Sequence, residues 1–275
     1  MRRRHALAVG LRREFRRLAL HPTVLAGLVL LGPALTALFA VVAAPSGLGG
    51  RPDAPNPDLG TCVAVLCICL SFLSMALSLT SVVGDREVIR REARWGVPPS
   101  AVVLSRATSR LLPAVVQAVV AVAVLALLRD GPETPLRLFE GWIGTVVTLC
   151  ALTVTSMCLG VLLSVAASSA EQAVSMMSGS LAVMVILSGL VVPLGSPDGA
   201  QAVLSWLSYA SPTRWAVSGI AAHIDLAPAG GLRPDGMWGH DHMHFVTGVG
   251  VLTAMSVACL GTSVAVLGRP SRTRR

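Results

Sequence analysis

Six long apolar runs divide this chain, and they constrain its fold more than any other feature. A helix needs roughly 20 apolar residues to cross the hydrocarbon core of a bilayer. Hydrophobic residues make up 53% of the 275 residues and charged residues only 13%, whereas soluble domains carry about 25% charged residues. The sequence therefore predicts an all-α, polytopic membrane protein in which residues 1–275 form one transmembrane domain. The six predicted spans lie near residues 23–44, 59–83, 107–128, 141–166, 173–193 and 245–267.

The arginines are distributed unevenly between alternate loops. Cytosolic loops of membrane proteins collect Arg and Lys. Of the 22 basic residues, 17 lie before the first span, between spans two and three or at their edges, and after span six, whereas the other loops hold five. This split predicts an even number of spans with both termini in the cytosol. We expect a multi-pass protein of the bacterial plasma membrane.

All 22 basic residues of the sequence are arginine, and the absence of lysine from these 275 residues excludes several kinds of chemistry. A Walker A loop needs a lysine on the nucleotide phosphates, and Schiff-base catalysis needs an amine. With Arg106 and Arg110 assigned to the edge of the third span, we expect no charged residue or histidine inside the spans. Ion-coupled transporters usually need such a group in the membrane. The sequence therefore predicts neither an enzyme nor an ion-coupled transporter.

Residues 6–21 form a basic amphipathic segment ahead of the first span. Leu7, Leu11 and Phe15 fall on one helical face, and the arginines of residues 12–17 take the other. Such a helix lies along the membrane interface against anionic headgroups. Two alternatives stay open, namely a cleaved signal peptide, for which the following apolar run is too long, and a plain positively charged anchor.

The densest charge cluster occupies residues 84–100, between spans two and three. Asp85 stands where a carboxylate suits a helix N-terminus, Arg91 follows Glu87 by four residues, and Pro98 ends the element. The pattern predicts a short charged helix just below the membrane. It indicates either a docking helix for a cytosolic partner or a solvated loop.

Small and soft side chains dominate several spans. Small residues recur every four positions on span four, which favours close helix packing. Methionine suits promiscuous apolar binding. The methionines of spans two and five therefore have two interpretations, namely an apolar substrate cavity between these spans or ordinary core packing. The small-residue stripe consists of Ser156, Gly160, Ser164 and Ser168, and the candidate cavity residues are Phe72, Met75, Met176, Met177 and Ser180.

The longest stretch outside the spans is residues 194–244. The Ser-Pro pair at 211–212 predicts the start of a helix within it. Near its end, His240, His242 and His244 are a weak candidate for a transition-metal site. A polar run before span six is the favoured interpretation, so we expect no metal.

The chain resembles permeases of the ABC-2 type, in particular the ABC-G branch of multidrug and sterol exporters. The Asp-Arg…Arg-Glu motif within residues 85–92 is similar to their first intracellular loop. The sequence Ser-Gly-Leu-Val-Val-Pro-Leu at 188–194 resembles the end of their fifth helix, and Ser-Pro-Thr-Arg-Trp at 211–215 resembles the external turn that follows. His-Pro at 21–22 departs from the Arg-Asp-Pro that usually ends their connecting helix.

This resemblance implies roles for individual segments and residues. Residues 6–21 would be a connecting helix, 84–100 a cytosolic coupling helix, and 194–244 an external segment with a short re-entrant helical element between helices five and six. One set of residues would transmit the motion of an ATPase, and another would form the external gate. The ATPase-coupling set is Asp85, Arg86, Arg91 and Glu92, and the gate set is Leu190 and Val191.

The predicted function is the permease subunit of an ATP-driven exporter that moves a hydrophobic or amphipathic compound, such as a drug, an antibiotic or a lipid, out of the cell. No cofactor is expected in this chain, because ATP and Mg²⁺ would bind a separate ATPase subunit. The expected partners are that ATPase, a second permease chain (homodimer or paired permease), the small-molecule substrate and membrane lipid, with no nucleic acid. The alternative is a non-transporting membrane scaffold or an immunity protein.

Overall fold

The computed structural model describes residues 3–20, 22–43, 46–51, 53–129, 131–133, 141–191, 200–233 and 235–269. Within these residues the chain forms helices and no strand, apart from one isolated bridge between Arg51 and Ala54. The helices are α1 (Arg3–Leu20), α2 (Pro22–Ala26), the π-helical turn η1 (Gly27–Leu31), α3 (Gly32–Ala43), α4 (Leu59–Leu79), the 3₁₀ turn η2 (Val83–Asp85), α5 (Arg86–Arg94), α6 (Pro99–Leu128), α7 (Ile143–Ala166), α8 (Ala170–Ile186), α9 (Ala200–Ser208), α10 (Pro212–Ile224), α11 (Leu226–Gly230) and α12 (His242–Leu267).

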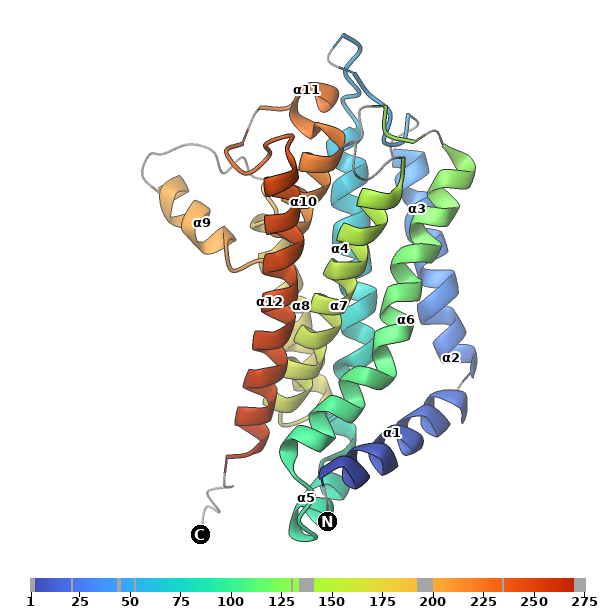
Figure 1. The fold of residues 1–275 in the computed structure, drawn as a ribbon, viewed down its shortest axis with the longest axis vertical. Coiled ribbons are helices and arrows are strands. Elements are labelled where there is room, and N and C mark those ends of the chain that lie inside the picture. Colours follow the sequence, from blue (N-terminus) through green and yellow to red (C-terminus); the bar gives the residue numbers. More distant parts are fainter. Residues whose placement is uncertain are drawn as a thin grey trace.

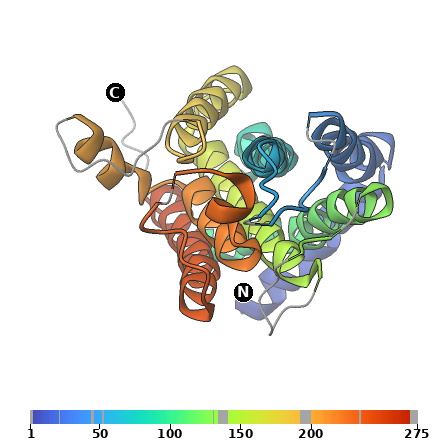
Figure 2. The ribbon, with the colours of Figure 1, turned by 90° about the horizontal axis from the view of Figure 1, so that it is seen from above.

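Helix α7 lies at the centre of the bundle, where it packs against α4, α6, α10 and α12. Helices α6 and α12 flank α7 and contact each other far less than each contacts α7 (Figure 2). Helix α1 lies obliquely across one end of the bundle, against α6, and α5 lies at the same end (Figure 1). We call this the α5 end, and the opposite end, where α11 lies, the α11 end.

Four helices of the described chain are long and apolar enough to cross a membrane, namely α4, α6, α7 and α12. They fall on four of the six predicted spans. The predictions at 23–44 and 173–193 fall on shorter apolar helices, Gly27–Ala43 and Ala170–Ile186. At 1.5 Å per residue, the 17 residues of α8 extend about 26 Å, slightly less than the roughly 30 Å hydrocarbon core. The structure therefore shows a helical protein with four membrane-capable helices, and six spans stay a prediction.

Helix α6 begins at Pro99, eight residues before the span predicted at 107–128. Proline suits this first position because the first turn leaves its backbone N–H groups unpaired. Arg106 and Arg110 consequently lie inside a continuous helix and are only 1% and 8% exposed. The sequence assigned both arginines to the edge of the third span, and the structure buries them against a carboxylate from a distant part of the chain.

Close contact between α4 and α7 holds the centre of the bundle together. A Cβ atom on Gly160 would lie 2.6 Å from the carbonyl oxygen of Met75, so the two helices approach this closely only where α7 carries glycine. One turn further along α7, the Ser164 hydroxyl accepts hydrogen bonds from the backbone N–H groups of residues 82 and 83, at 2.9 and 3.0 Å. The predicted packing role of the small residues on α7 is confirmed at both positions.

A buried glutamine connects three segments in the apolar interior. The Gln117 side chain on α6 accepts a hydrogen bond from the Ser74 hydroxyl on α4 at 2.6 Å. Its amide nitrogen donates to the carbonyl oxygen of Leu28, in the π-helical turn η1, at 3.0 Å. Because an unpaired amide would be costly in this apolar setting, the two bonds fix the first helical segment against α4 and α6.

A helical element lies between α8 and α12, within the segment predicted at 194–244. Helix α10 begins at Pro212, directly after Ser211, as the sequence motif predicted. Almost all of α10 is buried against α7 and α12, whereas α9 exposes Trp206 by 78%. The start of α10 is confirmed, and its re-entry into the membrane stays a prediction.

Candidate functional site

The hairpin between α4 and α6 projects from the α5 end of the bundle (Figure 1). Helix α4 ends at Leu79, the turn η2 leads into α5, and the chain then turns at Gly96 into α6. Gly96 has a φ of +80°, a conformation that costs glycine little and other residues much more. A short charged helix therefore lies within the predicted segment 84–100.

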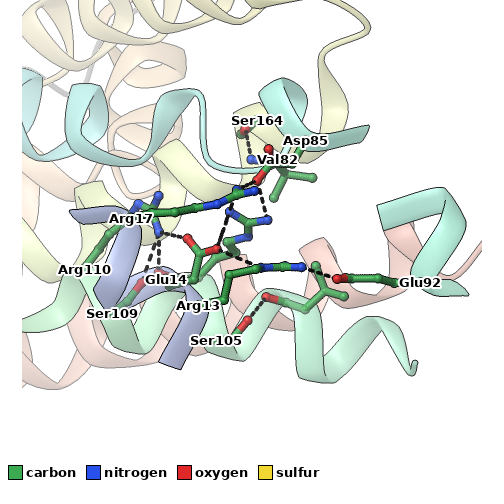
Figure 3. A network of polar contacts seen from close by, with 12 residues as sticks. Arg13, Glu14, Arg17, Val82, Asp85, Glu92, Ser105, Ser109, Arg110 and Ser164 are labelled. Carbon is green, nitrogen blue, oxygen red and sulfur yellow. Dashed lines mark hydrogen bonds and ion pairs between the residues drawn. The ribbon is translucent and has the colours of Figure 1, made fainter. Parts of the chain in front are cut away.

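A buried ion cluster joins α1 to α6 beside this hairpin (Figure 3). The Glu14 carboxylate on α1 lies 2.7 Å from Nη1 of Arg106 and 3.3 Å from Nη1 of Arg110. The side chains of Glu14 and Arg106 are 1% and 2% exposed. Charges withdrawn from water to this extent are tolerated only with close partners. These pairs therefore fix the face that α1 turns toward α6.

Asp85 extends the cluster to the start of α5. Nη2 of Arg106 donates to Oδ2 of Asp85 at 2.7 Å, and Arg17 of α1 pairs with the same oxygen. Asp85 occupies the N-cap position of α5 without a side-chain cap hydrogen bond, so these arginines replace the predicted contact with the helix N-terminus. Burial raises the pKa of Asp85, but hydrogen bonds and charges from Arg106 and Arg17 outweigh this effect and lower it below its ordinary value. Asp85 therefore stays ionised near neutral pH.

Two further contacts attach α5 to its neighbours. Glu92 pairs with Arg13 of α1 (Figure 3). Arg86 donates from Nη2 to the carbonyl oxygens of Val165 and Ala167 at the end of α7, at 2.9 Å for Val165. Together with the Asp85 contacts, these bonds attach the α5 hairpin to α1, α6 and α7. Helix α5 is therefore bound to three other helices.

The four predicted coupling residues divide into two groups. Asp85, Arg86 and Glu92 bind other parts of the chain, whereas Arg91 is exposed. Trp95, just beyond α5, is 80% exposed. Arginine and tryptophan are enriched at protein interfaces. We therefore predict that Arg91 and Trp95 contact a partner, and that the three inward residues transmit its motion.

The sequence did not predict the contacts that Glu14, Arg13 and Arg17 of α1 make at this site. Arg13 and Arg17 were expected on the polar face of an interfacial helix and Phe15 on its apolar face. Instead the structure turns Glu14 toward the bundle and leaves Phe15 51% exposed. A signal was available, because Glu14 is the only acidic residue among the first 52. One carboxylate among seven arginines indicates a specific partner, but the sequence does not show which arginine it meets.

The predicted external gate residues lie just beyond the end of α8. Leu190 packs against the main core, and Val191 is 57% exposed. The preceding Gly189 has a φ of +82°, and the guanidinium of Arg214 packs directly against it. Arg214, on α10, is 2% exposed and donates from Nη2 to Oδ2 of Asp235 at 2.6 Å. A buried ion pair therefore positions the backbone just before the gate residues.

Replacing Asp235 by asparagine is expected to lower the free energy of unfolding by about 1–2 kcal/mol, because Arg214 loses a charged acceptor while a neutral oxygen remains. Thermal unfolding of the purified chain in detergent measures this loss. The matched control is Asp53→Asn at an exposed position, with an expected change within about 0.5 kcal/mol. Equal unfolding temperatures for the two variants would show that the ion pair does not hold the gate backbone.

The five candidate cavity residues differ in their exposure in the structure. Met75 and Met177 are 0% and 5% exposed in a packed cluster between α4, α7 and α8. Phe72 is 43% exposed, and Met176 and Ser180 are partly exposed. In the single chain, Met75 and Met177 are packing residues. A cavity closed by a second chain stays a prediction that depends on the other three.

The histidine run at 240–244 does not gather around one point. Nδ1 of His240 lies 2.9 Å from the carbonyl oxygen of Ala222, and Nδ1 of His244 lies 2.7 Å from the Asp241 carboxylate. Asp241 also accepts the backbone N–H of His244 at 2.7 Å and caps α12. Within the described residues, no three His, Cys, Asp or Glu side chains are grouped as metal ligands. The weak metal candidate gains no support from this geometry.

Two comparisons with known proteins found similar sequences. The profile of a family described as ABC-2 type transporter matches residues 5–224, which include most of α1, the α5 hairpin and α10. A protein of Mycobacterium tuberculosis (strain ATCC 25618 / H37Rv), named ABC transporter ATP-binding/permease protein Rv1747, is 27% identical over 213 residues. The match covers 76% of this chain and 24% of that protein, so the chain spans about a quarter of the relative's length.

Proposed function

Because this chain belongs to the ABC-2 type transporter family, and is thus a transmembrane component of an ABC transporter, we propose that it is the permease subunit of an ATP-driven exporter. The exported compound is hydrophobic or amphipathic, such as a drug, an antibiotic or a lipid. The α5 end faces the cytosol of a bacterial cell, as the arginine distribution favours. ATP and Mg²⁺ bind an ATPase outside these 275 residues, which contain no lysine for a Walker A loop.

The observation that carries the proposal is the ion cluster at the α5 end. A loop that only connects two spans can remain solvated, whereas this hairpin is held by buried charges to α1 and α6 and by hydrogen bonds to α7. Coupling between distant sites travels through packed elements that move together. A force on the exposed side of α5 would therefore reach α6 and α7, which extend along the bundle.

A second permease chain completes the transport path in this proposal. Helix α8 exposes apolar side chains, including Val174, Val183 and Ile186. Exposed apolar surface of this kind suits contact with another membrane helix. A homodimer or a paired permease would close a cavity between the chains, lined by Phe72 and its neighbours. The compound would leave it past Leu190 and Val191.

Arg91→Glu is expected to reduce the ATPase turnover that depends on this chain about tenfold, because reversing the charge at a docking contact costs more than 1 kcal/mol. The tagged chain is purified from its native membrane with its ATPase, and vanadate-sensitive ATP hydrolysis is measured. Arg91 is exposed, so the free energy of unfolding is expected to change by no more than about 0.5 kcal/mol. Arg12→Glu, exposed on α1 at the same end, is the matched control.

The outcomes separate the docking assignment from the exporter proposal. If Arg91→Glu leaves both association and turnover unchanged, α5 is not the docking helix. If no ATPase co-purifies with the unaltered chain, the exporter proposal fails, and a non-transporting scaffold or immunity protein takes its place.

A further inference from the structure

An arginine-rich pocket opens at the α5 end, between α5, the start of α6 and the ends of α7 and α12. Its volume is about 860 Å³, within the range of small-molecule sites. Apolar side chains, including Ile89, Val165 and Leu267, form part of its wall, and none of the residues that line it is acidic. The pocket also holds four guanidinium groups, those of Arg86, Arg90, Arg94 and Arg269.

The charges of this pocket are not neutralised by the buried ion cluster. Among the described residues, Arg94 and Arg269 form no ion pair, and Arg90 lies 4.0 Å from Glu87, whose side chain is 92% exposed. Arg86 uses Nη2 on the carbonyls of α7, and its Nε is buried without a hydrogen-bond partner in the described chain. A surplus of positive charge therefore borders one volume, where an anion would gain charge-assisted hydrogen bonds.

A separate apolar groove lies further along the bundle from this pocket. Helices α6 and α12 pack on α7 but scarcely on each other, and a groove of about 370 Å³ lies between them with α7 as its floor. On α12 the groove begins at Leu260, about 9 Å along the helix from Val266 of the pocket. On α6 it begins at Leu104, about 3 Å along the helix axis from Val102 of the pocket but on another side of the helix. Val257 on the groove wall is 66% exposed, so the groove opens outward, on the side that would face lipid.

We propose that the pocket and the groove together bind one anionic phospholipid of the surrounding bilayer. The phosphate and an uncompensated anionic headgroup lie among the four guanidinium groups, which match phosphate geometry. One acyl chain lies in the groove, where it packs against the apolar side chains of α6, α7 and α12. A zwitterionic lipid of the same chain length would use the groove equally but would offset its own phosphate charge. The headgroup charge therefore sets the preference, as in other basic pockets at membrane surfaces.

The position of the pocket on α5 favours a lipid over a protein occupant. At 100° per residue, Arg86, Arg90 and Arg94 fall within about 80° of one another around α5, whereas Arg91 and Trp95 lie outside that arc. A bound lipid thus leaves the exposed docking side free. A soluble partner would bury the guanidinium groups but would have no segment to fill a groove that continues between α6 and α12. The inference requires only that the chain lies in a membrane, so it stands apart from the exporter proposal.

The test measures lipid affinity on the delipidated full-length chain in neutral detergent by native mass spectrometry. Dioleoyl phosphatidylglycerol is titrated against dioleoyl phosphatidylcholine, which shares its acyl chains. We expect the anionic lipid to bind at least about tenfold more tightly, since each nearby arginine contributes roughly fivefold. The double variant Arg94→Gln/Arg269→Gln should reduce this preference to about twofold or less. The control double variant, Arg12→Gln/Arg16→Gln, removes the same charge from exposed positions of α1 and should keep the preference.

A second arm tests the groove and the source of the phosphate. Val257→Trp should lower the affinity for both lipids several-fold, because the larger side chain fills the groove. Val246→Trp, at a position exposed elsewhere on α12, should leave both affinities unchanged. Glycerol phosphate should compete poorly, because it lacks the acyl chain. The proposal is overturned if the two lipids bind equally, if both arginine pairs have the same effect, or if Val257→Trp changes nothing. It is also overturned if glycerol phosphate binds as tightly as the lipid, or if Arg94→Gln/Arg269→Gln releases the ATPase while the lipid preference persists.

Discussion

Glu14→Gln is expected to lower the free energy of unfolding by about 3–5 kcal/mol, because it leaves buried arginines without their carboxylate. Arg110 loses the acid at 3.3 Å, and Arg106 keeps only Asp85. A glutamine can replace a hydrogen bond but not the charge. Thermal unfolding of the purified chain, followed by circular dichroism in detergent, measures the loss. The same variant should free α1 from α6, which trypsin would detect as faster cleavage at Arg16.

The control for this experiment is Glu87→Gln, at an exposed acidic position of the same end. The Glu87 side chain is 92% exposed and lies 4.0 Å from Arg90, so its pair contributes at most about 0.5–1 kcal/mol. Both variants remove one carboxylate from the chain and differ only in burial. If Glu14→Gln destabilises the chain no more than Glu87→Gln, water reaches the cluster and its charges do not hold α1 in place.

Apolar length and local motifs predicted the membrane helices and the position of the hairpin. Four predicted spans became α4, α6, α7 and α12, because a long apolar run has few stable arrangements other than a membrane helix. The Ser-Pro pair gave the start of α10 for an equally local reason, since proline suits the first helical turn. Such signals act within one or two turns of the chain and are therefore readable without a structure.

The functional pairs could not be read in the same way, because they join distant positions. Glu14 and Arg110 are separated by 96 residues, and several other arginines were equally available as partners. In the sequence Arg214 was a loop charge and part of the Ser-Pro-Thr-Arg-Trp motif, and neither observation indicated its pair with Asp235 or its contact with Gly189. Which arginine meets which acid depends on the rotation of each helix about its axis. That rotation is set by packing across the bundle rather than by any one segment.

Gly160→Leu is expected to lower the free energy of unfolding by at least about 3 kcal/mol, since overpacking of a rigid contact forces the backbones apart. A Cβ at this position would lie 2.6 Å from the oxygen and 3.0 Å from Cα of Met75, and neither atom belongs to a flexible side chain. Gly160→Ala should cost less, because the better helix propensity of alanine returns up to about 1 kcal/mol. Size-exclusion chromatography and thermal unfolding in detergent measure the series.

Gly261 on α12 is the matched control, because a Cβ there would meet no atom within 4 Å. Gly261→Leu should therefore leave the unfolding temperature unchanged or raise it. The contact at Gly160 also sets the register in which Ser164 accepts the N–H groups of residues 82 and 83, just before the α5 hairpin. Hydrogen exchange at these two amides should accelerate in Gly160→Leu and stay slow in Gly261→Leu. Unchanged exchange in both variants would mean that the contact between α4 and α7 does not support the α5 hairpin.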